Sequence, residues 1–341
     1  MRVLFWGTPD FALPPLRALL GEGFDVVGVV TQPDRAVGRS RSFLEPPPVK
    51  RVAEAEAVPV LQPERPRGDE FAAQLRGLNP DISVVVAYGH ILPQTIIDLP
   101  PRGTINIHAS LLPLLRGAAP IEAAIREGHA ETGVTIMRMV KALDAGPSIL
   151  QMRTPIADDE TSGELRLRLA ELGALALVEA LALLELGRAT ETPQDDSKAT
   201  YAHKIERAMT RIDWTGDAAA VSRTVRAYDP RPGAYAVRAA GEASHEFKVF
   251  GARVAARTTD RPPGEILSID DDGMTVSCGQ PAEAGGGAGG APGAGRVRDG
   301  GRGDGIRGVV QIASVHPAGK RPMSPREWAS GRGIAVGEKL S

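Results

Sequence analysis

The first half of the chain alternates short apolar runs with longer stretches of helical periodicity. Short apolar runs predict buried strands, and an apolar face with helical spacing predicts packed helices. Strands separated by helices form mostly parallel sheets that are covered on both faces. We therefore predict an α/β domain with strands at Val3–Trp6, Val26–Val30, Val58–Leu61, Ile82–Ala87, Thr104–His108 and Val134–Val140, and helices at Phe11–Leu20, Val49–Ala57, Asp69–Leu78 and Ala118–Arg126.

The second half of the chain has a different composition. A long helix is expected to begin at the capping box formed by Thr161 and Glu164 and to end near Leu186, before a polar linker. Short alternating runs with Gly and Pro turns then predict a small antiparallel barrel, preceded by a helix at Ala218–Ala227. The expected organisation is a sheet domain at 1–190, a linker at 191–207 and a barrel domain at 208–341, with apolar runs at Tyr235–Val237, Phe247–Val249, Glu265–Ile269, Met274–Cys278 and Val309–Ala313.

A glycine-rich segment interrupts the expected barrel. Residues 281–305 contain 11 glycines among 25 residues, with scattered arginines. Such a composition buries little apolar surface, so we expect a disordered loop. An arm that contacts RNA through its arginines is the alternative interpretation.

Composition limits the class of protein. The chain is 42% hydrophobic and 24% charged with a formal net charge of −2, which is typical of a soluble globular protein. No apolar run approaches the roughly 18 residues of a membrane span, and the amino terminus is too short for a signal peptide, so a cytoplasmic location is expected. The single cysteine, Cys278, has no disulfide or zinc partner and is expected to be a small buried residue.

The densest polar cluster lies at the end of the strand expected at Thr104–His108. Alternation along a strand places Asn106 and His108 on one face and Ile107 on the other. An amide donor and a titratable imidazole would thus emerge together, at the edge where open parallel sheets bind ligands. A core histidine paired with a backbone carbonyl fits the same segment equally well.

Two loops after expected strands add further candidates. Asp144 lies between apolar and turn residues, which suits either a partly buried carboxylate with a partner or a simple turn. Gly7–Phe11 follows the first strand but lacks the three glycines of a dinucleotide loop, so a nicotinamide cofactor is disfavoured. That segment is either a tight turn or a loop that contacts a ligand.

A long basic loop follows the second expected strand. The stretch Thr31–Arg51 carries Arg35, Arg39 and Arg41 and has a net charge of +3. Long loops beside the carboxyl end of a strand are often functional, and basic loops bind phosphate backbones. A solvated flap is the alternative.

Taken together, these segments resemble the methionyl-tRNA formyltransferase family. The resemblance covers nearly the whole chain apart from residues 281–305. It rests, in order along the chain, on Gly7–Phe11, Thr31–Arg35, Val86–Gly89, Asn106–Pro113, Arg116–Pro120, Glu131–Met137, Leu143–Gly146, Ala199–Ala202, Arg211–Trp214, Pro230–Gly233 and Ala318–Arg321.

The resemblance implies an activity and a set of site residues. It implies formyl transfer from 10-formyltetrahydrofolate to the α-amino group of methionyl initiator tRNA, with tetrahydrofolate released, no metal and no obligate protein partner. It also implies a Rossmann-like first domain and an OB-like barrel that binds tRNA. The implied catalytic trio is Asn106, His108 and Asp144; the implied folate contacts are Val86, Tyr88, Gly89, Ser110, Leu111, Leu112 and Pro113; the implied tRNA contacts are Arg35, Arg39, Arg41, Lys320 and Arg321.

The sequence departs from the family pattern in three places. Leu114 and Leu115 stand where a basic and an aromatic residue are usual, Ala142 replaces a glycine, and the glycine-rich segment is extra. Other formyl-folate enzymes would share the catalytic trio, including those that act on amino sugar nucleotides or glycinamide ribotide and the formylfolate hydrolases and dehydrogenases. A non-catalytic RNA-binding protein with a relic pocket is the alternative from a different class.

Overall fold

The structure is a computed structural model that describes residues 1–37, 43–240, 243–280 and 307–341. The described chain divides into two compact units. Unit 1 comprises Met1–Ala124, His129–Ala157 and Glu164–Lys204, and unit 2 comprises Ile125–Gly128, Asp158–Gly163 and Ile205–Ser341. The glycine-rich segment 281–305, expected to be a loop, lies outside the described residues.

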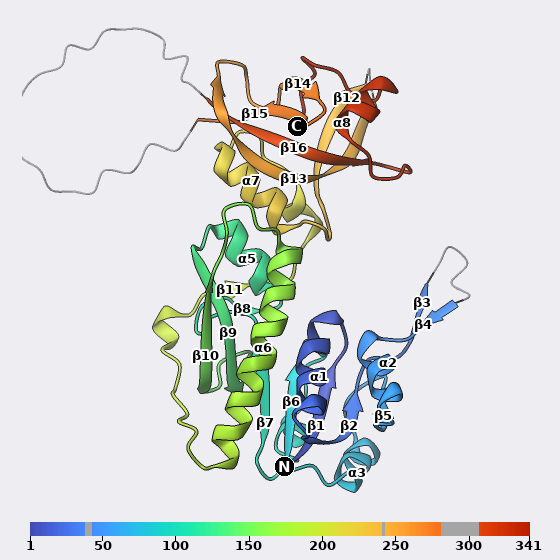
Figure 1. Cartoon of the computed structure of the whole chain (residues 1–341), viewed down its shortest axis with the longest axis vertical. Helices are drawn as coiled ribbons and strands as arrows, with labels where there is room; N and C mark the ends of the chain where they lie inside the picture. The colour runs from blue at the N-terminus through green and yellow to red at the C-terminus, as the bar shows by residue number, and fades with distance from the viewer. Residues whose placement is uncertain (38–42, 241–242, 281–306) are drawn as a thin grey trace, which may run out of the picture. The chain divides into compact units, whose positions relative to one another are not determined.

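Unit 1 is built on a seven-stranded sheet (Figure 1) with the order β10-β9-β7-β6-β1-β2-β5. The five strands from β7 to β5 are parallel, whereas β9 runs antiparallel to β7 and β10 antiparallel to β9. This confirms the predicted mostly parallel sheet. The strands are β1 (Arg2–Gly7), β2 (Asp25–Val30), β5 (Val60–Leu61), β6 (Ile82–Val86), β7 (Thr104–His108), β9 (Glu131–Arg138) and β10 (Ser148–Pro155).

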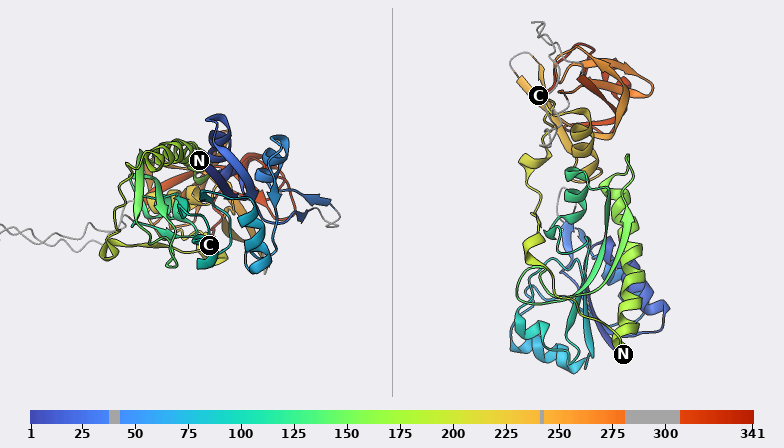
Figure 2. Two further views of the ribbon diagram at one scale, coloured as in Figure 1. Left: turned by 90° about the horizontal axis from the view of Figure 1, so that it is seen from below. Right: turned by 90° about the vertical axis from the view of Figure 1, so that its left-hand side faces the viewer.

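Helices cover both faces of this sheet (Figure 2), and strand alternation decides which side chains meet them. Leu4 and Trp6 of β1 pack in one cluster with residues of α3 and α4. Ile107 of β7 lies on the other face, next to Gly173 of α6. The helices of the unit are α1 (Leu13–Gly21), α2 (Pro48–Ala55), α3 (Asp69–Gly77), α4 (Gln94–Ile97), α5 (Pro120–Glu127, which ends in unit 2) and α6 (Ser162–Glu185, which begins there).

Small elements surround the sheet of unit 1. Two two-stranded sheets pair β3 (Arg35–Val37) with β4 (Phe43–Glu45) and β8 (Arg116–Gly117) with β11 (Tyr201–Ala202). The described part of unit 1 also contains the 3-10 helices η1 (Asp10–Ala12) and η2 (Asp196–Lys198). The β8–β11 pair is parallel and joins the segment after β7 to the segment after α6.

Unit 2 contains a five-stranded antiparallel sheet with the order β12-β13-β16-β15-β14. Its strands are β12 (Ala234–Ala240), β13 (Ala243–Thr259), β14 (Ile266–Asp270), β15 (Gly273–Ser277) and β16 (Arg307–Pro317), and its helices are η3 (Arg207–Thr210), α7 (Ala218–Ala227) and α8 (Pro325–Ser330). The predicted helix at Ala218–Ala227 is confirmed. β12, β13 and β16 are longer than the apolar runs that predicted them, whereas β14 and β15 have the predicted length and are shifted by one residue. Cys278 is buried as expected, and burial raises the pKa of its thiol to about 12.

The carboxy-terminal tail joins the two outer strands of this sheet. Lys339 bridges to Glu265 just before β14, and Leu340 bridges to Arg238 of β12. The backbone N–H of Val237 donates to the carbonyl of Ser341 at 2.8 Å, and the N–H of Ser341 donates back to Val237 at 2.9 Å. Because the tail contacts both edges, the sheet takes the barrel-like form that was expected.

The tail is anchored by one apolar side chain. Leu340 is 2% exposed and packs in the core of unit 2. We expect Leu340→Ala to lower the free energy of unfolding by about 2–5 kcal/mol, because it leaves a cavity where the barrel closes. Chemical denaturation measures the change, with the exposed Val336→Ala as the control. Equal stabilities for the two variants would show that the tail does not hold the barrel together.

Candidate functional site

A cavity of about 600 Å³ lies at the carboxyl ends of β1, β6 and β7 in unit 1. Phe11 after β1, the segment 87–92 after β6, the end of β7 and the loop 139–144 line it. This is the edge at which open parallel sheets bind ligands, and the volume is that of a small-molecule site. All three candidate catalytic residues, Asn106, His108 and Asp144, line this one cavity.

His108 and Asp144 face each other in this cavity. Nδ1 of His108 is 3.7 Å from Oδ2 of Asp144, and both side chains are largely buried, with exposures of 6% and 14%. The other ring nitrogen, Nε2, is 2.9 Å from the carbonyl oxygen of Leu115. Both ring nitrogens therefore face oxygen acceptors, an arrangement that suits a ring that gains and gives up a proton. His108 therefore both contacts a backbone carbonyl and lies in the cavity, so the two interpretations of this histidine that the sequence offered are compatible.

Asp144 is held in an unusual backbone conformation. Its φ is +49°, in the left-handed region that non-glycine residues seldom adopt. Its Oδ2 accepts a hydrogen bond from the backbone N–H of Gly117 at 2.8 Å. The same carboxylate oxygen therefore contacts β8 and faces His108, so the position of Asp144 depends on contacts outside its own loop.

Gln194 supports that loop, although no pattern in the sequence pointed to this residue. Its side-chain Nε2 donates to the carbonyl oxygens of Asp144 and Gly146, at 2.8 and 2.7 Å. Its Oε1 accepts from Nε and Nη2 of the buried Arg116, at 3.0 and 2.7 Å. Gln194 lies in a polar stretch between α6 and β11 that looked like a linker, and no periodic signal marks it.

Asn106 is half-buried, and its side-chain amide makes no hydrogen bond within the part of the chain that the structure describes. Its register partner in β6 is Val85, whose own partner in β1 is Trp6. Asn106 therefore lies on the face of the sheet that α3 and α4 cover, as alternation predicted, while Ile107 lies on the α6 face. An amide in the cavity without a protein partner is available to donate to a ligand.

The segment after β6 forms a second wall of the cavity. The side chains of Thr8 and Gln32 both donate to the carbonyl oxygen of Tyr88, at 3.1 and 2.9 Å. Gly89 has a φ of +89°, and a side chain there would collide with the amide of Gln32. Tyr88 and Gly89 line the cavity with Val85 and Ala87, whereas Val86 is buried in the sheet.

Tyr88 carries a buried hydroxyl that no other described group bonds. The side chain is 1% exposed, and burial raises the pKa of its hydroxyl to about 12, so it stays protonated at neutral pH. Its ring packs edge-on against Trp6 with 5.3 Å between the centroids. A rigid wall, the free amide of Asn106 and apolar surroundings fit a flat ligand that carries polar ring atoms.

The remaining expected folate residues line a different cavity. Ser110, Leu111, Leu112 and Pro113 border a space of about 340 Å³ in unit 1 that also contacts Arg153 and Lys198. The N–H of Leu112 donates to Oγ1 of Thr135 at 3.1 Å, and the hydroxyl of Ser110 donates to the carbonyl of Leu114 at 2.5 Å. Leu114 is 36% exposed at this border, while Leu115 is buried.

The residues expected to contact tRNA lie on the surface where they are described. Arg35 is exposed in β3 and donates to the side chain of Gln32. Lys320 is exposed, and Arg321 forms an ion pair with Glu327 at 2.5 Å. Arg39 and Arg41 lie outside the described residues. No helix in the described ranges is long and apolar enough to cross a membrane, and within those ranges no three His, Cys, Asp or Glu residues gather as metal ligands would.

Comparison with known proteins agrees with this geometry. The family described as formyl transferase matches residues 1–181, and the formyl transferase carboxy-terminal domain matches residues 204–333. The methionyl-tRNA formyltransferase of Marinobacter nauticus is 44% identical over 82% of this chain and 88% of its own length. That of Pseudomonas fluorescens (strain SBW25) is 48% identical over 83% of this chain and 87% of its own length.

Solved structures with lower identity share the fold. HypX from Aquifex aeolicus, in complex with tetrahydrofolic acid, has a TM-score of 0.60 at 21% identity; 97% of this chain matches 47% of that one, so this chain spans about half of HypX. An N-formyltransferase from Helicobacter canadensis has a TM-score of 0.61 at 14% identity over 91% of this chain and 98% of its own. From the matched domains and the relatives of high identity, the chain belongs to the methionyl-tRNA formyltransferase family.

Proposed function

We propose that this chain transfers the formyl group of 10-formyltetrahydrofolate to the α-amino group of methionyl initiator tRNA. The observation that carries the proposal is the convergence of Asn106, His108 and Asp144 in one cavity at the carboxyl edge of the sheet. Relatives at 44–48% identity that are named for this activity support it. The products are N-formylmethionyl-tRNA, which serves translation initiation in the cytoplasm, and tetrahydrofolate.

The reacting amine needs little activation. A free α-amine has a pKa of about 7.7–8.0, and the neighbouring ester lowers it, so much of the amine is neutral at physiological pH. The enzyme must instead stabilise the formyl oxygen, which gains negative charge when the amine attacks. The side-chain amide of Asn106 donates a hydrogen bond to that oxygen, and His108 provides a second donor.

The attacking nitrogen becomes positively charged and must lose a proton. His108 accepts it at Nδ1, the ring nitrogen that is not hydrogen-bonded to the Leu115 carbonyl, and Asp144 stabilises the charged ring from 3.7 Å. The pair then passes the proton toward the folate nitrogen that departs. This sequence requires no covalent bond between the chain and the formyl group.

The folate lies in the 600 Å³ cavity, against the wall formed by Tyr88 and Gly89. Val86 is buried at the end of β6, directly before this wall, and supports the wall from within the sheet. The segment Ser110–Pro113 borders the smaller cavity, so we assign it to the far end of the folate or to the support of the loop between β7 and β8. Arg35, Arg39, Arg41, Lys320 and Arg321 contact the tRNA phosphates.

Gln194 is a positioning residue for this reaction. We expect Gln194→Glu to lower kcat at least about tenfold, because the variant keeps an acceptor for Arg116 but loses both donors to the Asp144 loop, and small misplacements of reacting groups have large effects. Steady-state kinetics and thermal unfolding measure the effect. The exposed Gln94→Glu on α4 is the control. A Gln194→Glu enzyme with unchanged kcat would show that Gln194 does not position the catalytic groups.

The proposal is tested by direct assay of the purified chain. Methionyl initiator tRNA is incubated with 10-formyltetrahydrofolate, the ester is hydrolysed, and N-formylmethionine is quantified by mass spectrometry. We expect multiple turnovers that require both substrates. A folded protein that yields no N-formylmethionine would overturn the proposed function.

A further inference from the structure

The backbone between Leu115 and Gly117 contacts both members of the pair formed by His108 and Asp144. The carbonyl oxygen of Leu115, the residue directly before β8, lies 2.9 Å from Nε2 of His108. The N–H of Gly117, two residues later, donates to Oδ2 of Asp144 at 2.8 Å. The relative position of the imidazole and the carboxylate therefore depends on the path of this short segment.

The contact with Leu115 also decides which ring nitrogen of His108 carries the proton. A carbonyl oxygen can only accept a hydrogen bond, so Nε2 of His108 must be the donor. In the neutral ring the single proton is then on Nε2, and Nδ1 is free to accept the proton that the amine loses. The contact thus selects the tautomer that the proposed reaction requires.

Leu115 adopts a backbone conformation that needs support. Its φ is +58°, in the left-handed region that residues with a side chain seldom adopt, and the residue is 2% exposed. Such a residue keeps its conformation only where the surrounding structure holds it. The direction of the Leu115 carbonyl, and with it the contact to His108, therefore depends on the neighbours of Leu115.

Thr200, 85 residues further along the chain, holds this segment in place. Its hydroxyl oxygen accepts a hydrogen bond from the N–H of Leu115 at 2.8 Å. Its carbonyl oxygen accepts from the N–H of Arg116 at 2.9 Å, and its own N–H donates to the carbonyl of Pro113 at 3.3 Å. Thr200 is exposed and does not line the 600 Å³ cavity, so any effect that it has on the reaction passes through these neighbours.

We infer that Thr200 is a positioning residue that fixes the tautomer of His108 through Leu115. Without the hydroxyl, Leu115 relaxes toward an ordinary backbone conformation, and its carbonyl oxygen moves away from Nε2. The ring proton then moves to Nδ1, beside the carboxylate of Asp144, and the nitrogen that should accept a proton is blocked. The inference rests on the proposed function, and it differs from the role of Gln194, which acts on the loop of Asp144.

Removal of the hydroxyl tests this role kinetically. We expect Thr200→Val, which keeps the shape of the side chain, to lower kcat at least about tenfold with little change in the KM of either substrate, because Thr200 lies outside the cavity. Thr200→Ala should behave in the same way, since it also lacks the hydroxyl. Thr200→Ser keeps the hydroxyl and should restore most of the lost kcat.

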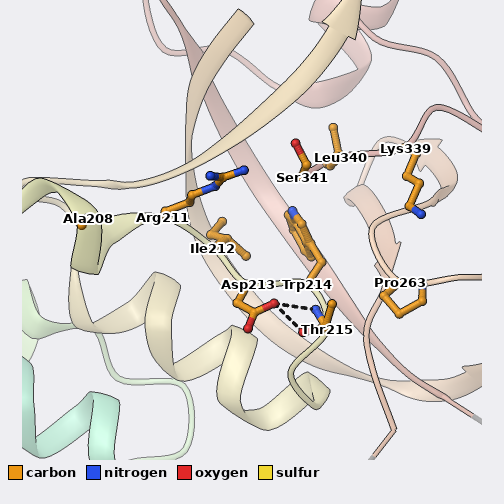
Figure 3. A pocket seen from close by; sticks show the side chains of 10 residues that line it. All are labelled: Ala208, Arg211, Ile212, Asp213, Trp214, Thr215, Pro263, Lys339, Leu340 and Ser341. Carbon is orange, nitrogen blue, oxygen red and sulfur yellow. Dashed lines mark hydrogen bonds between the residues drawn. The ribbon is translucent and has the colours of Figure 1, made fainter. Parts of the chain in front are cut away.

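Thr215→Val is the matched control. Thr215 is also exposed, and its hydroxyl donates to Oδ1 of Asp213 at 2.6 Å beside a cavity of unit 2 (Figure 3). This variant therefore loses a bonded threonine hydroxyl that has no link to His108. Equal kcat values for Thr200→Val and Thr215→Val would overturn the inference, as would a Thr200→Ser enzyme no faster than Thr200→Val.

The tautomer itself is measured by nitrogen NMR of the histidine side chains, because protonated and bare ring nitrogens differ widely in chemical shift. The signals of His108 are identified by their loss in His108→Gln. At alkaline pH we expect the proton on Nε2 in the wild type and in Thr215→Val, and a large share of it on Nδ1 in Thr200→Val. An unchanged His108 spectrum in Thr200→Val would overturn the inference even where kcat falls.

These spectra need no turnover, so they separate the inference from the proposed function. A wild-type chain that yields no N-formylmethionine, while Thr200→Val still moves the ring proton, would overturn the proposed function and keep the link between Thr200 and His108. An active wild-type enzyme whose His108 signals do not respond to Thr200→Val would overturn this inference alone.

Discussion

Asn106→Ala is expected to lower kcat for formyl transfer by about a hundred- to a thousandfold, which corresponds to about 2.7–4 kcal/mol of transition-state stabilisation. The reason is geometric. Asn106 lies at the cavity end of β7, and its amide has no partner in the described part of the chain, so its hydrogen bond is made only with the reacting group. Single-turnover kinetics with methionyl-tRNA measure the loss.

The fold should survive this substitution. Asn106 is half-buried and shares its face with Val85 and Trp6, whose packing does not depend on the amide. The isosteric Asn106→Asp is the control, because it keeps the shape of the side chain but replaces the donor with an acceptor. It should be at least as impaired as the Ala variant. Turnover within threefold of wild type in either variant would exclude Asn106 as an oxyanion donor.

Asp144→Asn is expected to lower kcat by roughly 10²–10⁴, the usual range for removing one member of an acid–base pair. The amide oxygen of Asn still accepts the hydrogen bond from Gly117, so the loop keeps its position. What disappears is the negative charge that faces Nδ1 of His108. The KM values for folate and tRNA should change little, because the lost interaction matters mainly when the ring is charged.

A second variant separates charge from structure at this position. Asp144→Ala removes the charge and the bond to Gly117 together, so it should lose activity and also lower the Tm of the protein. Thermal unfolding and kinetics on both variants measure the difference. An Asp144→Asn enzyme with near-normal kcat would show that the pair with His108 is structural.

Much of unit 1 was predictable because strand alternation is a local signal. The period of two along β7 places Asn106 and His108 together and Ile107 apart, and the structure confirms this arrangement. β10 was missed because only one of its eight residues is buried and polar side chains interrupt its apolar ones. An edge strand of that kind lacks the buried run that marks a central strand.

The contacts that the sequence did not reveal are those made between distant segments. Gln194 reaches the Asp144 loop across about fifty residues of chain, and its polar neighbours are typical of a linker. The tail closes the barrel through backbone hydrogen bonds, which depend little on side-chain pattern. Ser110–Pro113 follows β7 directly, yet these residues border a second cavity because the chain turns away after His108.

A competition between two acceptors shows directly whether tRNA is the substrate of this enzyme. Methionyl initiator tRNA and an amino sugar nucleotide are offered to the enzyme with 10-formyltetrahydrofolate, and the two kcat/KM values are compared. We expect rapid transfer to the tRNA and negligible transfer to the sugar. Preferential transfer to the sugar nucleotide would keep Asn106, His108 and Asp144 as the catalytic trio but contradict the assignment of tRNA as the acceptor.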